Sequence, residues 1–419
     1  MKLIKNIASL SLLQIANYIL PFIILPYLTK VLGPNNFGKI NFVLAVINYF
    51  LLFTDYGFNM SATQQVAIHK EDQKTLNKIF WTTNFSKAAL AFISLIILMV
   101  LIFIIKELRK DALLYIIGFT VVLQSLFSPV WFFQGIEKTE WIIPLSLIPK
   151  FLAFPLIFIY VKDSNDYVAT LVIQCLITFL LTAISCIWIF GKKNLVQWYQ
   201  PSFFEIKKAL HDGWHIFLST AAINFYTTSN IIILGIFTNN QVVGYFVAAD
   251  KLIKGVQALI FTIGQAAYPR INKYIMESKE KAATFLLLCI KWMGGVGIIA
   301  SMLLFLLAKF IVHFLYGSTQ YNPSVVLIQI MAFTPTIVSL GYVFGILGLL
   351  SFGFKTTYTK IYLMFGLFSL CLTIPLCYYF NMYGVSVSIV VTEFTIVSTM
   401  FYQLYKNKIL SSSKNLIYN

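Results

Sequence analysis

The sequence is short of charge, and this shortage excludes most soluble proteins. Only 11% of its 419 residues are Asp, Glu, Lys or Arg, whereas a soluble domain carries about 25%. So few charged side chains cannot cover the surface of a soluble protein of this length. The same scarcity argues against a disordered chain, which needs many polar and charged residues, and against a cytosolic enzyme.

Cysteine and the sequence motifs of common enzymes are also scarce. The five cysteines lie in apolar runs, and no two have the C-x-x-C spacing. We therefore expect small buried residues here, with neither a disulfide framework nor a zinc site. His211 and His215 have the i, i+4 spacing of metal ligands, but no third ligand is near, so we predict a membrane-boundary role and no metal. No P-loop, G-x-S-x-G or H-E-x-x-H motif occurs, which disfavours ATP-driven export by this chain alone.

Apolar residues take the place of the missing charges, because 59% of the chain is hydrophobic and 16% is aromatic. A transmembrane helix needs about 20 mostly apolar residues. The runs of this length lack the alternation of a membrane barrel, so helices are expected. The sequence predicts an all-α polytopic membrane protein with about twelve transmembrane helices. The expected spans cover roughly residues 7–29, 40–66, 81–105, 112–132, 141–161, 167–190, 214–237, 243–268, 283–308, 323–350, 358–380 and 384–405.

The net charge of +16, from 31 basic against 15 acidic residues, indicates how the chain is oriented. Lys and Arg accumulate in the cytoplasmic loops of membrane proteins. With twelve spans both termini lie on one side, and most Lys and Arg residues fall in loops on that side. We therefore predict that both termini lie in the cytoplasm. This distribution accounts for much of the charge without a nucleic-acid partner.

The two halves of the chain resemble each other. The turn Leu32–Gly38 reads LGPNNFG, and Phe237–Tyr245 reads FTNNQVVGY, so both are Asn-Asn turns before a glycine that opens a helix. Phe119-Thr120 and Phe333-Thr334 form a second match at a similar separation. Parallel repeats of this kind build transporters with the substrate site between the halves. The expected domains are six-helix bundles at residues 1–191 and 214–419, around a central cavity, with a cytoplasmic linker at residues 192–213.

The same turns carry a family resemblance. Leu32–Gly38 resembles the LGP-x-x-FG signature of polysaccharide-unit flippases, and Asp55–Phe58, which reads DYGF, resembles the motif that closes their second span. Those proteins are the Wzx-type O-antigen flippases of the multidrug/oligosaccharidyl-lipid/polysaccharide exporter superfamily. The resemblance implies translocation of an undecaprenyl-pyrophosphate-linked oligosaccharide from the cytoplasmic to the periplasmic leaflet of the bacterial inner (cytoplasmic) membrane. It implies membrane lipids as surroundings, and it leaves a polysaccharide polymerase and a chain-length regulator open as partners.

Charged residues inside the expected spans are the candidate site, because a charge at the membrane centre costs about 3 kcal/mol and usually faces a bundle interior or a wet cavity. A cavity with excess lysine suits an anion such as pyrophosphate. The cationic cavity is expected to contain Lys87, Lys150, Lys251, Lys254 and Lys291. The candidates for ion coupling are Asp55, Asp250 and Glu393. No cofactor is expected, and coupling to a proton or Na⁺ gradient is left open.

Each of these residues has a structural alternative. Lys87 and Lys291 could extend to the membrane surface, and Asp250 with Lys254 could form an i, i+4 ion pair. For Lys150 the sequence favours a functional role, because this residue lies between prolines, which break helical hydrogen bonds and open the backbone to a cavity. The remaining alternatives are headgroup contact for Lys251, a helix-end role for Asp55 and a structural salt bridge for Glu393.

Three other functions are open. A multidrug or cation antiporter of the same superfamily would favour acids over lysines in its cavity. A lipid II flippase typically has fourteen spans, two more than expected here. A membrane-embedded polysaccharide polymerase or glycosyltransferase belongs to a different class, and it usually needs a sizeable extramembrane loop that this chain lacks. The sequence therefore favours a transporter of lipid-linked oligosaccharide over an enzyme.

Overall fold

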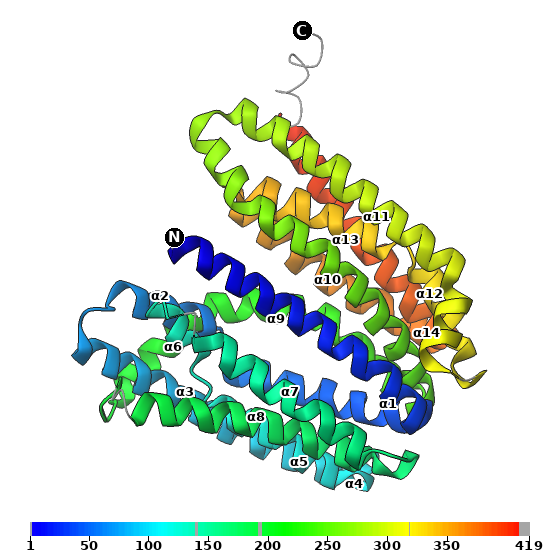
Figure 1. The fold of residues 1–419 in the computed structure, drawn as a ribbon, viewed down its shortest axis with the longest axis horizontal. Coiled ribbons are helices and arrows are strands. Elements are labelled where there is room, and N and C mark those ends of the chain that lie inside the picture. Colours follow the sequence, from blue (N-terminus) through cyan, green and yellow to red (C-terminus); the bar gives the residue numbers. More distant parts are fainter. Residues whose placement is uncertain (1, 139–140, 192–194, 318, 410–419) are drawn as a thin grey trace. The chain divides into compact units, whose positions relative to one another are not determined.

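A computed structural model describes residues 2–138, 141–191, 195–317 and 319–409, and the described part contains helices and no strand (Figure 1). The all-α class is therefore confirmed, and each expected span lies on a helical segment. The helices are α1 (Lys2–Asp55), α2 (Phe58–Ile68), α3 (Gln73–Ile104), α4 (Lys106–Lys110), α5 (Ala112–Ser125), α6 (Val130–Gly135), α7 (Ile142–Tyr160), α8 (Tyr167–Phe190), α9 (Phe203–Phe237), α10 (Asn240–Glu277), α11 (Lys279–Tyr316), α12 (Asn322–Met331), α13 (Thr334–Tyr342) and α14 (Lys355–Lys406). Short elements are η2 (Ser164–Asp166), η3 (Thr319–Tyr321) and the π-helical η4 (Val343–Leu350).

Six described helices are long and apolar enough to cross a membrane, and a bent pair, Thr319–Met331 with Thr334–Leu350, brings the number to seven. This is fewer than twelve partly because α1 and α14 each run through a break that separates two expected spans. The breaks lie at Gly33 and Asn381, whose φ angles are 67° and 50°. Glycine adopts this left-handed region without a steric penalty. The chain is thus a multi-pass membrane protein.

The chain forms two compact units. Unit 1 comprises Met1–Leu20 and Lys39–Ala221, and unit 2 comprises Pro21–Gly38 and Ala222–Asn419. The segment Pro21–Gly38 of α1 therefore belongs with the C-terminal half, and α9 is divided between the units. The boundaries of these units differ from those of the two predicted six-helix bundles. The division into bundles at residues 191 and 214 therefore stays a prediction.

The core of unit 1 forms where the second part of α1 packs with α3, α5 and α8, and where α2 packs with α6. Phe119 of α5 and Leu171 of α8 are buried in the first cluster. Trp131, Phe132 and Phe133 are buried in the second. The outer sides of α3 and α8 keep large apolar side chains exposed, such as Phe103, as expected for helices that face lipid.

The core of unit 2 lies among α10, α11, α13, η4 and α14. Helices α10, α11, α13 and α14 run side by side in Figure 1. Leu286 of α11, Leu347 of η4 and Met400 of α14 are fully buried there. The apolar faces of these helices hold the polar positions of α10 and α14 in place.

Helix α9 begins at Phe203, eleven residues before the expected span at residues 214–237. Ser202 and Glu205 cause the early start. The Glu205 backbone N–H donates to Ser202 Oγ at 3.3 Å, and the Ser202 N–H donates to Glu205 Oε2 at 2.8 Å. This reciprocal capping box satisfies backbone groups at the first turn of a helix. The preceding segment packs on α3, where Trp81 Nε1 donates to the Gln197 carbonyl at 2.9 Å.

The two copies of the repeated turn meet within unit 2. A Cβ added at Gly38 would overlap the carbonyl oxygen of Asn240, and a Cβ added at Gly244 would overlap that of Pro34. Pro34 precedes Gly38 by the same four positions as Asn240 precedes Gly244. The contact is therefore reciprocal, as it is between segments related by a two-fold axis. Only glycine permits this backbone contact.

Candidate functional site

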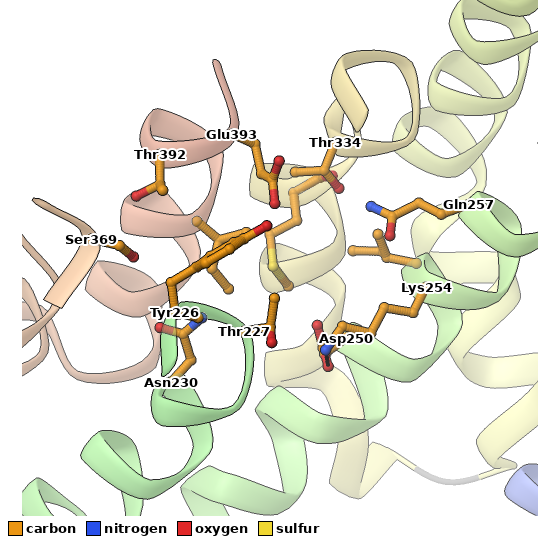
Figure 2. Close-up of a pocket in the computed structure, with 13 residues that line it drawn as sticks. Tyr226, Thr227, Asn230, Asp250, Lys254, Gln257, Thr334, Ser369, Thr392 and Glu393 are labelled. Atoms are coloured by element: carbon orange, nitrogen blue, oxygen red, sulfur yellow. Dashed lines mark hydrogen bonds and ion pairs between the residues drawn. The ribbon is translucent and has the colours of Figure 1, made fainter. Parts of the chain in front are cut away.

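Each unit contains, within the described residues, a pocket lined by charged and polar residues from expected membrane spans. The C-terminal pocket lies in unit 2, and Figure 2 shows side chains from α9, α10, α13 and α14 converging on it. Its lining consists of Tyr226, Thr227, Asn230, Asp250, Ile253, Lys254, Gln257, Met331, Thr334, Ser369, Ile389, Thr392 and Glu393.

Asp250 and Lys254 form the predicted i, i+4 pair in this pocket. Lys254 Nζ lies 2.7 Å from Asp250 Oδ2, and the two residues lie one helical turn apart on α10. The Lys254 side chain is 51% exposed and that of Asp250 11% exposed. The ammonium thus remains accessible while its carboxylate partner is largely covered.

Glu393 reaches the same pocket from α14 (Figure 2). Its carboxylate makes no hydrogen bond or salt bridge within the described residues, since Lys254 pairs with Asp250, so the alternative of a structural salt bridge is not seen there. The neighbouring hydroxyl of Thr392 is buried and also lacks a hydrogen-bond partner in the described part of the chain. With Asp250, Lys254 and Glu393 ionised, the pocket has two carboxylates against one ammonium, so uptake of a proton or a small cation would balance its charge.

The N-terminal pocket lies in unit 1 and has a volume of about 410 Å³. It contains a second ion pair, in which Lys87 Nζ of α3 donates to Asp55 Oδ1 at 2.7 Å. The Lys87 side chain is only 1% exposed, whereas that of Asp55 is 26% exposed. Lys87 therefore does not extend to a surface, and Asp55, the last residue of α1, is more than a helix end.

The other three predicted lysines lie apart from these two pairs. Lys251 Nζ of α10 lies 5.2 Å from the ring centroid of Phe37 within unit 2, a cation–π distance, and it has no salt bridge within the described residues. Lys291 is exposed on α11 beside the exposed side chains of Leu288 and Trp292. Lys150 lies on α7, and its side chain, like that of His215, is outside the described part of the structure. The cationic cavity stays a prediction.

The uncharged polar residues of both pockets were not identified from the sequence. In the N-terminal pocket they are Asn59, Gln124, Ser125, Ser128, Gln134, Thr178 and Thr182. Single Ser and Thr residues are common in membrane helices, where they bond the preceding turn. The signal that could have found them is the spacing of Thr178 and Thr182, which lie on one face of α8. Within the described residues no cluster of His, Cys, Asp or Glu is suited to hold a metal.

Relatives of the chain are found by sequence over nearly its whole length. A family model described as "Polysaccharide biosynthesis protein" matches residues 3–275. The chain is 32% identical over 409 residues to a protein of Escherichia coli (strain K12) named "Putative O-antigen transporter", and the match covers 97% of each. A protein of Shigella dysenteriae with the same name is 32% identical over 398 residues, covering 94% of this chain and 98% of the other.

Solved structures share the fold at low sequence identity. An inward-facing multidrug resistance MATE family transporter of the MOP superfamily matches with a TM-score of 0.75 and 13% identity, covering 96% of this chain and 99% of the other. Lipid II flippase MurJ, in an inward closed conformation, matches with a TM-score of 0.73 and 13% identity, covering 97% and 91%. At such identity these likenesses establish the fold and not the transported molecule.

Proposed function

The chain belongs to the polysaccharide biosynthesis protein family, and from this premise we propose that it is a lipid-linked oligosaccharide flippase. The expected family resemblance is confirmed, and the chain is a transporter and not an enzyme. The proposed cargo is an undecaprenyl-pyrophosphate-linked oligosaccharide, moved from the cytoplasmic to the periplasmic leaflet of the bacterial inner membrane. The observation that supports this most directly is 32% identity over 97% of a protein named as an O-antigen transporter.

The charges inside the spans support a path for an anionic head group. Lys251 makes no salt bridge within the described residues, and Lys254 keeps half of its side chain exposed. Both lie on α10, and we assign them to the pyrophosphate, for which lysine serves as a point charge. The lipid tail stays in the bilayer while rocking of two half-structures alternates access. Lys291, among exposed apolar side chains, is assigned to the lipid boundary.

Glu393 is our candidate for coupling to an ion gradient. It adds a second carboxylate to the C-terminal pocket and has no hydrogen-bond partner there within the described residues. An ionised carboxylate inside the membrane costs free energy unless a cation or proton accompanies it. We therefore propose that a proton or Na⁺ occupies this position during part of the transport cycle, with no other cofactor.

A complementation assay tests the cargo. A bacterial strain lacking its own O-antigen transporter, supplied with matching glycosyltransferases, should regain surface polysaccharide when it expresses this chain. Lys251→Ala and Lys254→Ala should reduce the polysaccharide at matched protein levels, whereas Lys291→Ala should not. Failure of the unaltered chain to restore polysaccharide, although it is present in the membrane, would contradict the proposal. Loss of a polymerase or chain-length regulator should change chain length without stopping translocation.

Orientation in the membrane is a second part of the proposal. Reporter fusions after Lys74 and Lys408 should report cytoplasm, and fusions after Lys110 and Tyr321 should report periplasm. Opposite signals at two of these sites would overturn the cytoplasmic placement of the termini.

A multidrug antiporter is the second candidate, because the C-terminal pocket has more carboxylates than ammonium groups. A cation pump needs an accessible negative site, which Glu393 provides. Raised resistance to cationic drugs in a pump-deficient strain, abolished by Glu393→Gln, would favour it. Unchanged drug resistance together with restored polysaccharide would favour the flippase.

A further inference from the structure

The N-terminal pocket differs from the rest of the polar membrane interior in its chemistry. Its volume of about 410 Å³ lies within the range of roughly 300–1,000 Å³ found for small-molecule sites. Apart from Trp131, half of its fourteen lining residues have uncharged side chains that donate or accept hydrogen bonds. These side chains come from α2, α5, α6, α8 and the turn before α6, so the helices of unit 1 face the pocket with their polar positions.

The two charges of this pocket neutralise each other. Lys87 is buried against Asp55 at 2.7 Å and has no exposed ammonium left for an anion. A pyrophosphate would need free cations, and no other lysine or arginine lines this pocket within the described residues. Asp55 has a second carboxylate oxygen, and its side chain is 26% exposed. That oxygen can accept hydrogen bonds, since an ionised carboxylate has two acceptor atoms.

Three of the uncharged residues are joined by hydrogen bonds between α5 and α8. Thr178 of α8 donates to Gln124 Oε1 of α5, and Thr182 donates to the Gln124 carbonyl at 3.2 Å. This fixes the Gln124 amide with its two N–H donors still available. Trp131 also lines the pocket, and its buried Nε1 has no hydrogen-bond partner in the described part of the chain. A buried donor left unpaired is costly, so an acceptor is expected to reach it.

A ligand that suits this pocket is neutral and rich in groups that both donate and accept. An anion finds no free cation, and an organic cation finds a carboxylate already neutralised by Lys87. Sugar hydroxyls match the amides, the Ser and Thr hydroxyls and the remaining Asp55 oxygen. We propose that the N-terminal pocket binds a sugar residue of the oligosaccharide, while the pyrophosphate is bound by lysines elsewhere. This rests on the proposed function, and it assigns the sugar-recognising residues.

The test compares two lipids that differ only in the sugar. The probes are undecaprenyl pyrophosphate and the undecaprenyl-pyrophosphate-linked oligosaccharide extracted from the bacterium that encodes the chain. Binding to the full chain in lipid nanodiscs is measured for Gln124→Leu and Thr182→Val. The matched control is Gln174→Leu, because Gln174 has similar exposure on α8 but does not line the pocket. Thr182→Val keeps the side-chain shape and decides the question if Gln124→Leu does not fold.

Each pocket variant should weaken binding of the glycolipid about three- to tenfold, the effect of one net hydrogen bond. Binding of the sugar-free lipid should be unchanged in the same variants, and the control should bind both lipids normally. Equal weakening for both lipids, or unchanged glycolipid binding in both pocket variants, would overturn the sugar site. If the unaltered chain binds neither lipid, the proposed function itself is contradicted. If it flips glycolipid but binds it no better than the sugar-free lipid, only the sugar site fails.

Discussion

The two pockets contain the same pair of side chains, an aspartate and a lysine 2.7 Å apart, in opposite settings. In unit 1 the lysine is covered, with Lys87 1% exposed, and Asp55 is the more accessible partner. In unit 2 Lys254 is the accessible partner, and Asp250 is 11% exposed. The partner that remains accessible decides what a pocket can bind, so a residue's charge type alone does not identify its role.

The pairs also differ in their sequence separation. Asp250 and Lys254 are neighbours on one helix, whereas Asp55 and Lys87 come from different helices. Glu393 has no counterpart in the N-terminal pocket, whose only ionised side chains within the described residues are the paired ones. In unit 1 the pocket therefore has no net charge, because its one lysine and one aspartate form an ion pair. In unit 2 the pocket has one carboxylate more than it has ammonium groups.

Breaking the buried pair should have the largest effect on stability. Lys87→Met leaves Asp55 without its cation and should lower the free energy of unfolding by about 3 kcal/mol, the low end for buried pairs because Asp55 is partly exposed. The midpoint of thermal unfolding in detergent measures this. Adding Asp55→Asn to Lys87→Met should recover much of the loss. A single variant as stable as the unaltered chain would show that the pair is not structural.

Removing the excess carboxylate should affect transport more than stability. Glu393→Gln keeps the side-chain shape and removes the ionisable group, so the variant should bind lipid-linked substrate yet lose the dependence of flipping on the ion gradient. Flipping into proteoliposomes with and without an imposed proton or Na⁺ gradient measures this. Gradient dependence equal to that of the unaltered chain would exclude Glu393 as the obligatory carrier.

Breaking the accessible pair should cost little stability. Lys254→Met combined with Asp250→Asn removes both charges of the i, i+4 pair and leaves no unpaired carboxylate, and pairs with an exposed partner contribute about 0.3–0.5 kcal/mol. The same thermal measurement should therefore separate it clearly from Lys87→Met. A loss as large as that of Lys87→Met would mean that accessibility does not distinguish the two pockets.

An exposed pair in unit 1 provides the smallest expected effect. Lys78 Nζ lies 2.6 Å from Glu205 Oε1, and this ammonium, with the Ser202 N–H, lowers the pKa of Glu205 to about 2 from the usual 4.5. Because the folded pKa is the lower one, the stabilisation is complete above pH 4.5 and is lost as the pH falls towards 2.

The unaltered chain should therefore unfold at a slightly higher temperature than Glu205→Gln at pH 7. That difference in unfolding temperature should shrink only below about pH 4.5. The control is Lys74→Gln, which removes an exposed lysine from α3, the helix that also carries Lys78. A difference that already disappears between pH 7 and pH 5 would contradict the assignment of this pair.

The sequence predicted whatever depends on local patterns. Long apolar runs predicted the helices, the turn at Leu32–Gly38 predicted the family, and helical spacing predicted the Asp250–Lys254 pair, all of which are confirmed. The capping box at Ser202 and Glu205 is a local pattern too, and it was missed because the surrounding lysines indicated a linker.

Contacts between distant segments were not predictable. Asp55 and Lys87 are 32 residues apart, and nothing in a single sequence indicates that α1 and α3 bring them together. The uncharged groups of the N-terminal pocket escaped notice for another reason. A Ser or Thr hydroxyl can bond the preceding turn of a membrane helix, and Gln124 carries no charge. Neither Gln124 nor Thr182 is therefore conspicuous in the sequence, although the fold places both in one pocket.

The placement of Pro21–Gly38 in unit 2 limits how this protein can be divided. A gene fragment that encodes only residues 222–419 would lack the helical segment Pro21–Gly38, which belongs to the same compact unit. A fragment that ends before residue 222 would contain this segment without the rest of its unit. Chimaeras between relatives should therefore function best when residues 21–38 are exchanged together with the C-terminal half. A simple cut at the middle of the gene would leave Gly38 and Gly244 from different parents to fit against each other.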